Sequence, residues 1–125
     1  MSVAKRLVRV MIAVDDMPKA KEFYAGALGL KVVQDYRKDD SHWWASLTLP
    51  EEGTTIALST YHEKTKPGGM VLYFATSDIT AAHKELSDKG VKVNDVKDDL
   101  YGPGSGVKWF TLNDPDGNLI HIVQA

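Results

Sequence analysis

The sequence contains no cysteine among its 125 residues, and this absence excludes several kinds of site. A disulfide framework, a zinc-thiolate site and a cysteine nucleophile all require a thiol. Long hydrophobic runs are also missing, because Lys5, Arg6 and Arg9 interrupt the apolar residues of the N-terminal segment. Since a signal peptide or a membrane helix needs an uninterrupted apolar stretch, we expect a cytoplasmic protein with no membrane partner.

An excess of charge of one sign is absent too, because 15 Lys and Arg side chains are nearly balanced by 17 Asp and Glu side chains. The formal net charge of -2 is too small to favour binding to nucleic acid. A content of 43% hydrophobic and 26% charged residues is that of an ordinary globular domain with an apolar core. The partners expected from composition are therefore small molecules or other proteins.

Strand and helix patterns alternate along the chain. Asp16 and Asp78 are each followed by a helical pattern and are expected to be its N-terminal cap, and Gly29 supplies a left-handed stop. In the first helix, Met17, Ala20, Phe23 or Tyr24, and Ala27 or Leu28 share one face. The patterns predict helices over 17–29 and 79–90, and strands over 6–14, 31–38, 42–49, 54–61, 70–77, 91–96, 107–114 and 119–124.

The order of these elements predicts an internal repeat, since the two caps lie 78 - 16 = 62 residues apart and the same order follows each. The fold class expected is α+β, with two βαβββ repeats that form curved mixed sheets around a cleft. We predict one domain over 1–125, made of repeats 1–64 and 69–125 joined by a linker at 65–68. Because neither half buries enough surface alone, the halves should pack together or against a second chain, and we expect a homodimer.

Two motifs point to a family: "VDDMPKAKEFYAGALGLKV" in the first half and "DPDGNLIHIV" at the end of the second. Together they resemble the vicinal oxygen chelate superfamily, which includes glyoxalase I, extradiol dioxygenases, fosfomycin-modifying enzymes and bleomycin-resistance proteins. The resemblance implies a divalent metal held at four positions, which in this sequence are Arg9, Ala57, Val71 and His121. Only His121 can bind a metal, whereas catalytic sites usually have three protein ligands, so we predict no metal and no cofactor. His42 or His62 could serve as a substitute ligand if the register of the fourth strand is different, and His62 is the better placed of the two.

The four positions that the resemblance implies are taken to face the cleft. Because side chains alternate along a strand, the other residues on the same strand faces are predicted to line the cleft too. The lining is apolar and aromatic with one cation, which suits a hydrophobic or aromatic small molecule, with an anionic group as one option for Arg9. The other reading of Arg9 is exposure at a dimer seam. The ligand-binding residues predicted are Arg9, Met11, Trp44, Ser46, Ala57, Ser59, Tyr61, Val71, Tyr73, Trp109, Thr111 and His121, with Val123 on the same face.

Several residues have two readings. Trp43 and Trp44 should point to opposite faces of a strand, so at least one should be core. His121 is a hydrogen-bonded pocket wall or a general acid or base. His83 is expected on the helix surface, and the charged run "DVKDD" at 95–99 is expected in solvent. The segment "YGPGSG" at 101–106 is expected to be an adaptable lid that borders the cleft, with Tyr101 at its tip.

Two functions follow. The first is a metal-free binding protein of the bleomycin-resistance kind, which holds a small molecule in an aromatic cleft. The second is a glyoxalase-type or dioxygenase-type enzyme with a displaced metal site or with acid/base chemistry at His121. The loss of three ligand positions favours the first, so the sequence leans away from an enzyme.

Overall fold

The structure is a computed structural model that describes residues 2–61 and 66–125. It divides into two compact units, Met1–Gly68 and Gly69–Ala125, and each is considered separately below. The division lies beside the linker predicted at 65–68. His62, considered only as a substitute metal ligand, lies outside the described residues. Within those residues, no helix combines the length and the apolar character that a membrane span requires.

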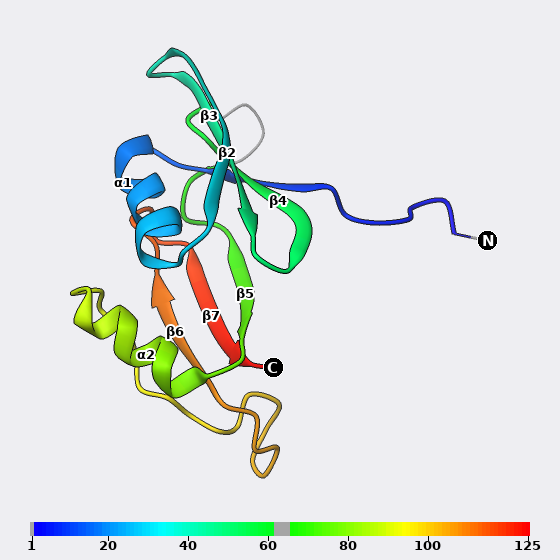
Figure 1. The fold of residues 1–125 in the computed structure, drawn as a ribbon, viewed down its shortest axis with the longest axis vertical. Helices are drawn as coiled ribbons and strands as arrows, with labels where there is room; N and C mark the ends of the chain where they lie inside the picture. The colour runs from blue at the N-terminus through cyan, green and yellow to red at the C-terminus, as the bar shows by residue number, and fades with distance from the viewer. Residues whose placement is uncertain (1, 62–65) are drawn as a thin grey trace. The chain divides into compact units, whose positions relative to one another are not determined.

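The first unit has the strand and helix order expected of a βαβββ repeat (Figure 1). Its four strands form one mixed sheet in the order β1-β4-β3-β2, in which β1 and β4 are parallel and the other pairs antiparallel. The elements are β1 (Arg9–Ala13), α1 (Met17–Lys21), the π-helix η1 (Glu22–Ala27), β2 (Lys31–Asp39), β3 (His42–Leu49) and β4 (Glu52–Ser59).

The predicted helix over 17–29 is α-helical only in its first part. It begins as expected, because the Asp16 side chain accepts a hydrogen bond from Lys19 N at 3.1 Å, and Gly29 follows it with φ +84°. From Glu22 the helix widens to π geometry. The wider turn places Phe23 and Tyr24 both on the buried side, with their rings packed edge to face, so the expected choice between these two residues does not arise.

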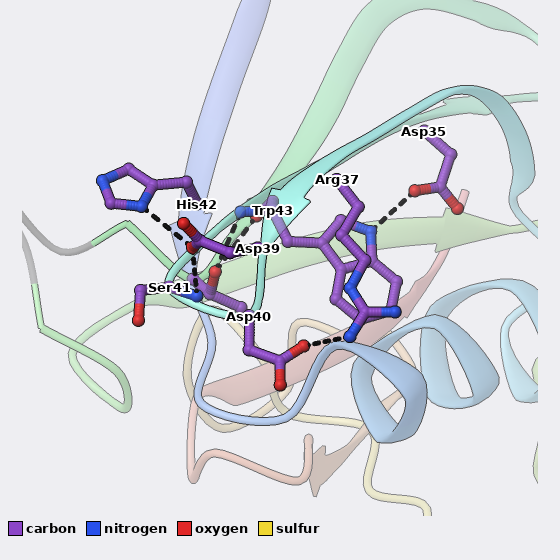
Figure 2. A network of polar contacts seen from close by, with 8 residues as sticks. Asp35, Arg37, Asp39, Asp40, Ser41, His42 and Trp43 are labelled. Atoms are coloured by element: carbon purple, nitrogen blue, oxygen red, sulfur yellow. Dashed lines mark hydrogen bonds and ion pairs between the residues drawn. The ribbon is translucent and has the colours of Figure 1, made fainter.

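The α1 side of the first sheet is closed by apolar packing and one polar cluster. Lys21 of α1 forms an ion pair with Asp35, and the Trp43 indole N–H donates to the same carboxylate at 2.7 Å. Arg37 lies over the Trp43 ring at 4.6 Å (Figure 2). Neither Trp43 nor Trp44 belongs to the buried core, so the expectation that at least one of them is a core residue is wrong. Trp43 is half-buried, and its edge and face contact the charged groups of Asp35 and Arg37.

A β-bulge in β2 changes which side chains face which way. Val32 is paired with Leu47, but Gln34 is paired with Ser46, so Val33 is an extra residue on β2. If β2 kept all its residues in a regular ladder with no bulge, strict alternation would turn Asp35 away from α1 and Tyr36 towards α1. The bulge therefore sends Asp35 to its ion pair and Tyr36 to the opposite face.

The second unit forms a mixed sheet in the order β5-β7-β6, with β5 parallel to β7 and β6 antiparallel to it. The predicted strand over 91–96 is not a regular strand, and an isolated bridge joins Lys97 to Trp109 instead. The segment still lies along β6, because Asn94 N donates to the Thr111 carbonyl at 2.9 Å and the Asn94 side chain donates to the Thr111 hydroxyl. The elements are β5 (Val71–Thr76), α2 (Ile79–Asp88), β6 (Trp109–Asn113) and β7 (Leu119–Gln124).

Three side chains hold the segments at the two ends of the second sheet in place. Gln124 accepts a hydrogen bond from Ile79 N at 2.7 Å and so holds the start of α2. At the other end, Asp114 accepts from Asn118 N and Nδ2, both at 2.8 Å, and Asn118 Oδ1 accepts from Met70 N at 2.8 Å. With two small mixed sheets and few helices, the α+β class predicted from the sequence is confirmed.

Candidate functional site

The first open face is the side of the sheet β1-β4-β3-β2 that lies opposite α1. Lys21 of α1 binds Asp35, so Asp35 and its cross-strand partners face α1. The residues that alternate with them along the strands point away from α1. Six of the predicted ligand-binding residues share this face by register: Arg9, Met11, Trp44, Ser46, Ala57 and Ser59.

The centre of the first open face is made of small side chains. Met11 is opposite Ala57, and Ala57 is opposite Ser46, so one residue from each of three neighbouring strands forms a row. Ser46 and Ala57 are buried, whereas Met11 and Trp44 on either side are exposed by 51% and 36%. The accessible side chains in this part of the face are therefore Met11 and Trp44.

Aromatic rings gather toward the β2–β3 hairpin end of this face. Tyr36 stacks on Trp44 with ring centroids 4.6 Å apart, and His42 stacks on Tyr61 at 5.1 Å. Figure 2 shows Asp39 beside His42, whose Nδ1 lies 3.0 Å from the carboxylate. Sequence reasoning missed Tyr36 because only the bulge turns it to this face, and it considered His42 only as a substitute metal ligand.

The second open face is the side of the sheet β5-β7-β6 that lies opposite α2. His83 of α2 packs edge-on against Phe110, so neighbours of Phe110 along β6 point away from α2. His83 is therefore half-buried between α2 and the sheet, and the expectation of a surface position is wrong. The second open face carries Val71, Tyr73, Trp109, Thr111, His121 and Val123.

Three rings on the second open face form one stack. His121 is on the central strand β7, with Tyr73 opposite it on β5 and Trp109 diagonal to it on β6. The Tyr73 ring lies 4.1 Å from the imidazole at 17°, and the Trp109 ring lies 5.5 Å from it at 14°. Parallel rings on three adjacent strands fix the plane of the imidazole. Tyr73 at the end of the stack is 61% exposed.

His121 combines burial with an unsatisfied nitrogen. The residue is 9% exposed, and its Nδ1 is buried without a hydrogen-bond partner among the described residues. Burial lowers the pKa of His121 below its ordinary value, because an imidazolium between two rings loses its hydration. The neutral form, with one donor and one acceptor nitrogen, is thus favoured at neutral pH.

Trp109, at the other end of the stack, is connected to the segment before β6. Its indole N–H donates to Asp99 at 3.1 Å, and the Lys97 ammonium lies 5.6 Å from its ring centroid. The charged run at 95–99 is exposed, as expected, but two of its side chains also position this ring. The hydroxyl of Thr111 accepts from Asn94 Nδ2 at 2.6 Å.

A sequence model of the Glyoxalase/Bleomycin resistance protein/Dioxygenase superfamily matches residues 6–122. The chain belongs to this superfamily. YraH of Bacillus subtilis (strain 168), an uncharacterized protein, is 29% identical over 95% of this chain and 98% of its own length. TnmS3, an antibiotic binding protein from Streptomyces sp. CB03234, superposes with a TM-score of 0.81, 25% identity and 98% coverage of both chains. A superfamily member from Sphaerobacter thermophilus DSM 20745 superposes with a TM-score of 0.79 at 26% identity and 98% coverage of both.

The superfamily includes metal-dependent enzymes by name, so the four positions expected to hold a metal can be compared with the side chains present. Arg9 has a guanidinium that does not ligate metal, and Ala57 and Val71 have only hydrocarbon side chains. Of the described residues, no three His, Asp or Glu side chains come together as a metal ion would require. These side chains do not fit a divalent metal ion.

Arg9 and the glycine-rich segment complete the set of predicted features. Arg9 is exposed and forms no salt bridge within the part of the chain that is described. Gly102, Gly104 and Gly106 all have positive φ, which suits a chain reversal that other residues rarely adopt. Tyr101 in the same segment is 78% exposed. Its role as the tip of a lid stays a prediction.

Proposed function

We propose that this protein is a small-molecule binding member of its superfamily that works without a metal and holds a flat hydrophobic or aromatic ligand. The observation that carries the proposal is the stack on the second open face. Tyr73 lies on β5, an edge strand, and its ring stacks on His121 on one side only among the described residues. A further aromatic ring can extend the stack over Tyr73, where offset stacking and apolar burial both favour it.

The first open face supports the same ligand class. Trp44 is 36% exposed on it and stacks with Tyr36, and the exposed part of these rings offers an aromatic surface to a flat molecule. Arg9 adds a cation that has no carboxylate partner in the described salt bridges. A carboxylate or phosphate on the ligand would provide that partner, since guanidinium groups bind such anions in two-pronged geometry.

The solved structures give the proposal its wider support. TnmS3 is described as an antibiotic binding protein and matches this chain over nearly its whole length. A likeness at 25% identity does not identify the ligand. It does favour binding of an organic small molecule as the activity to test before turnover.

An enzyme remains the second candidate, and one observation favours it. The neutral imidazole of His121 is a competent general base, because its lowered pKa keeps it unprotonated at neutral pH. Turnover of a catechol or of a methylglyoxal-thiol adduct that disappears in His121→Ala would support this candidate. A wild-type protein that is inert toward both would remove it.

The binding proposal is tested with 2-naphthoate and its neutral amide, 2-naphthamide, by equilibrium dialysis. We expect Tyr73→Ala to weaken binding of both by roughly three- to tenfold, as the loss of one aromatic stacking contact would. Arg9→Gln tests the first open face by itself, and it should weaken any binding of the naphthoate, but not of the naphthamide, that Tyr73→Ala leaves unchanged. Trp43→Phe is the matched control, because Trp43 lies on the opposite side of the first sheet, and it should bind both as the wild type does. The proposal would be refuted if neither compound bound, or if the wild type and Tyr73→Ala bound them equally well.

We also propose that the chain forms a homodimer, because each open face leaves large side chains such as Met11 and Tyr73 exposed. Static light scattering at micromolar concentration tests it directly. A monomeric mass would refute the dimer without touching the proposal on ligand binding.

A further inference from the structure

The outer edge of β5 presents backbone groups that no other strand of the described residues uses. β5 is an edge strand whose one ladder there is the parallel pairing with β7. The ends of this ladder fix its phase, because Leu119 N donates to the Met70 carbonyl at 3.0 Å and Ala125 N donates to the Thr76 carbonyl at 2.9 Å. Successive residues of a strand direct their N–H and C=O to opposite edges, so the even-numbered residues face β7. The odd-numbered residues direct both groups away from the sheet: Val71, Tyr73 and Ala75.

These outward groups are accessible and lie on an uncharged strand. Val71, Tyr73 and Ala75 are all exposed, and no hydrogen bond joins their outward groups to another described residue. By contrast, the opposite edge of the same sheet, at β6, is already bonded to Asn94 and Lys97. β2, an edge of the first sheet, bears charged side chains, which discourage pairing with a further strand. β5 has the sequence "VLYFAT", with no charged side chain, so its edge suits an uncharged partner.

Tyr73 brings the outward backbone groups and the free ring face together. In an added antiparallel strand, the residue opposite Tyr73 would exchange two bonds with it: its N–H donates to the Tyr73 carbonyl, and its C=O accepts from Tyr73 N. The side chain of that residue would lie beside the Tyr73 ring on the same face of the sheet. Tyr73 and His121 have a similar arrangement, as cross-strand neighbours whose rings stack at 4.1 Å. One amino-acid-like unit can therefore contact the ring and both backbone groups at once.

We propose that the ligand is a peptide-like aromatic molecule, in which an aromatic side chain stands between an amide N–H and an amide C=O that pair with Tyr73 on the free edge of β5. The inference rests on the proposed function and specifies its ligand class. Such a unit suits the edge because it has one donor and one acceptor in the spacing of a strand. Its ring needs to reach only the outer face of Tyr73, which is exposed.

The test compares three derivatives of 2-naphthylalanine by equilibrium dialysis. The parent is the N-acetyl methylamide, which has an amide on each side of the naphthyl group. The ester analogue has an oxygen in place of the N–H that would donate to Tyr73. The N,N-dimethylamide is the matched control, because it removes only the N–H that would point away from β5. We expect the parent to bind roughly three- to tenfold more tightly than the ester analogue, the effect of one hydrogen bond, and the dimethylamide to bind as the parent does.

Amide hydrogen exchange, followed by nuclear magnetic resonance, locates the bond on the protein. The outward N–H of Tyr73 should exchange rapidly in the ligand-free protein and at least about tenfold more slowly when the parent compound is saturating. The N–H groups of Leu72 and Phe74 are internal controls, because they face β7 and should be protected before any ligand is added.

Equal binding of the parent and the ester analogue would overturn the inference and leave the proposed function standing. Slow exchange of the Tyr73 N–H in the ligand-free protein would also overturn it, because a second copy or another segment would then occupy the edge. The same conclusion would follow if the parent bound without slowing this exchange, or if 2-naphthamide bound and none of the three derivatives did. Absence of binding to all four compounds would overturn the proposed function together with the inference.

Discussion

Replacing His121 by phenylalanine should make the protein more stable, although it changes a central residue of the candidate site. The unpaired, buried Nδ1 costs the folded state roughly 1–3 kcal/mol, which the substitution removes. The phenylalanine ring can keep the stacking with Tyr73 and Trp109, while its slightly larger ring offsets part of the gain. We expect the free energy of unfolding at about pH 7 to rise by about 1 kcal/mol.

The difference should grow as the pH falls. Burial lowers the pKa of His121 in the folded state, so between the two pKa values the unfolded chain binds more protons than the folded one. The wild type therefore loses stability as the pH falls below about 6.5, the ordinary value for histidine, and the phenylalanine variant lacks this loss. The carboxylates Asp35 and Asp39, whose pKa values are lowered by hydrogen bonds from Lys21 and His42 respectively, lose their contribution only below about pH 4.

Urea unfolding followed by far-ultraviolet circular dichroism measures both effects, at about pH 7 and about pH 5.5. This signal is preferable to tryptophan fluorescence, because Trp109 stacks on the mutated position. A variant that is less stable than wild type at the higher pH would show that the imidazole nitrogen has a partner. If the variant and the wild type differed in free energy of unfolding by the same amount at both pH values, the argument that burial lowers the pKa of His121 would be refuted.

Two further substitutions and one deletion test the local structure by the same urea unfolding. Asp114→Ala removes the acceptor for both bonds from Asn118, and we expect a loss of roughly 3 kcal/mol; a loss below about 1 kcal/mol would contradict the network. Gly29→Ala places a side chain at φ +84° and should cost roughly 1 kcal/mol, whereas Gly53→Ala, with open space around it, should change stability by less than about 0.5 kcal/mol. Deletion of Val33 removes the extra residue but lets Gln34, Asp35 and Tyr36 keep their partners and faces in a regular ladder, so it should cost less than about 1 kcal/mol; a loss above about 2 kcal/mol would show that β2 needs the bulge itself.

Local chemistry made much of the fold predictable. The caps Asp16 and Asp78 and the stop at Gly29 act through their own side chain or backbone, so the sequence alone is enough to find them. The resemblance to the superfamily supplied the inward-facing position His121, and alternation along the strands extended that prediction to other residues, of which Trp109 lies on the same face as His121. The π-helix at Glu22–Ala27 was not predictable, because six residues are too few for its wider period to be told from that of an α-helix in the sequence.

The candidate site divides in the same way between sequence and tertiary structure. Periodicity and turn residues determined the class of fold and the order of most elements, because these follow from the side chains of a few neighbours along the chain, and the resemblance to the superfamily supplied the strand faces that turn inward. The bulge at Val33, the place of Tyr36 beside Trp44, and the sandwich around His121 were decided only by pairing between strands distant in sequence. The unpaired nitrogen of His121 also belongs to this second group, since burial and the absence of a partner depend on every neighbour a residue meets in the folded chain.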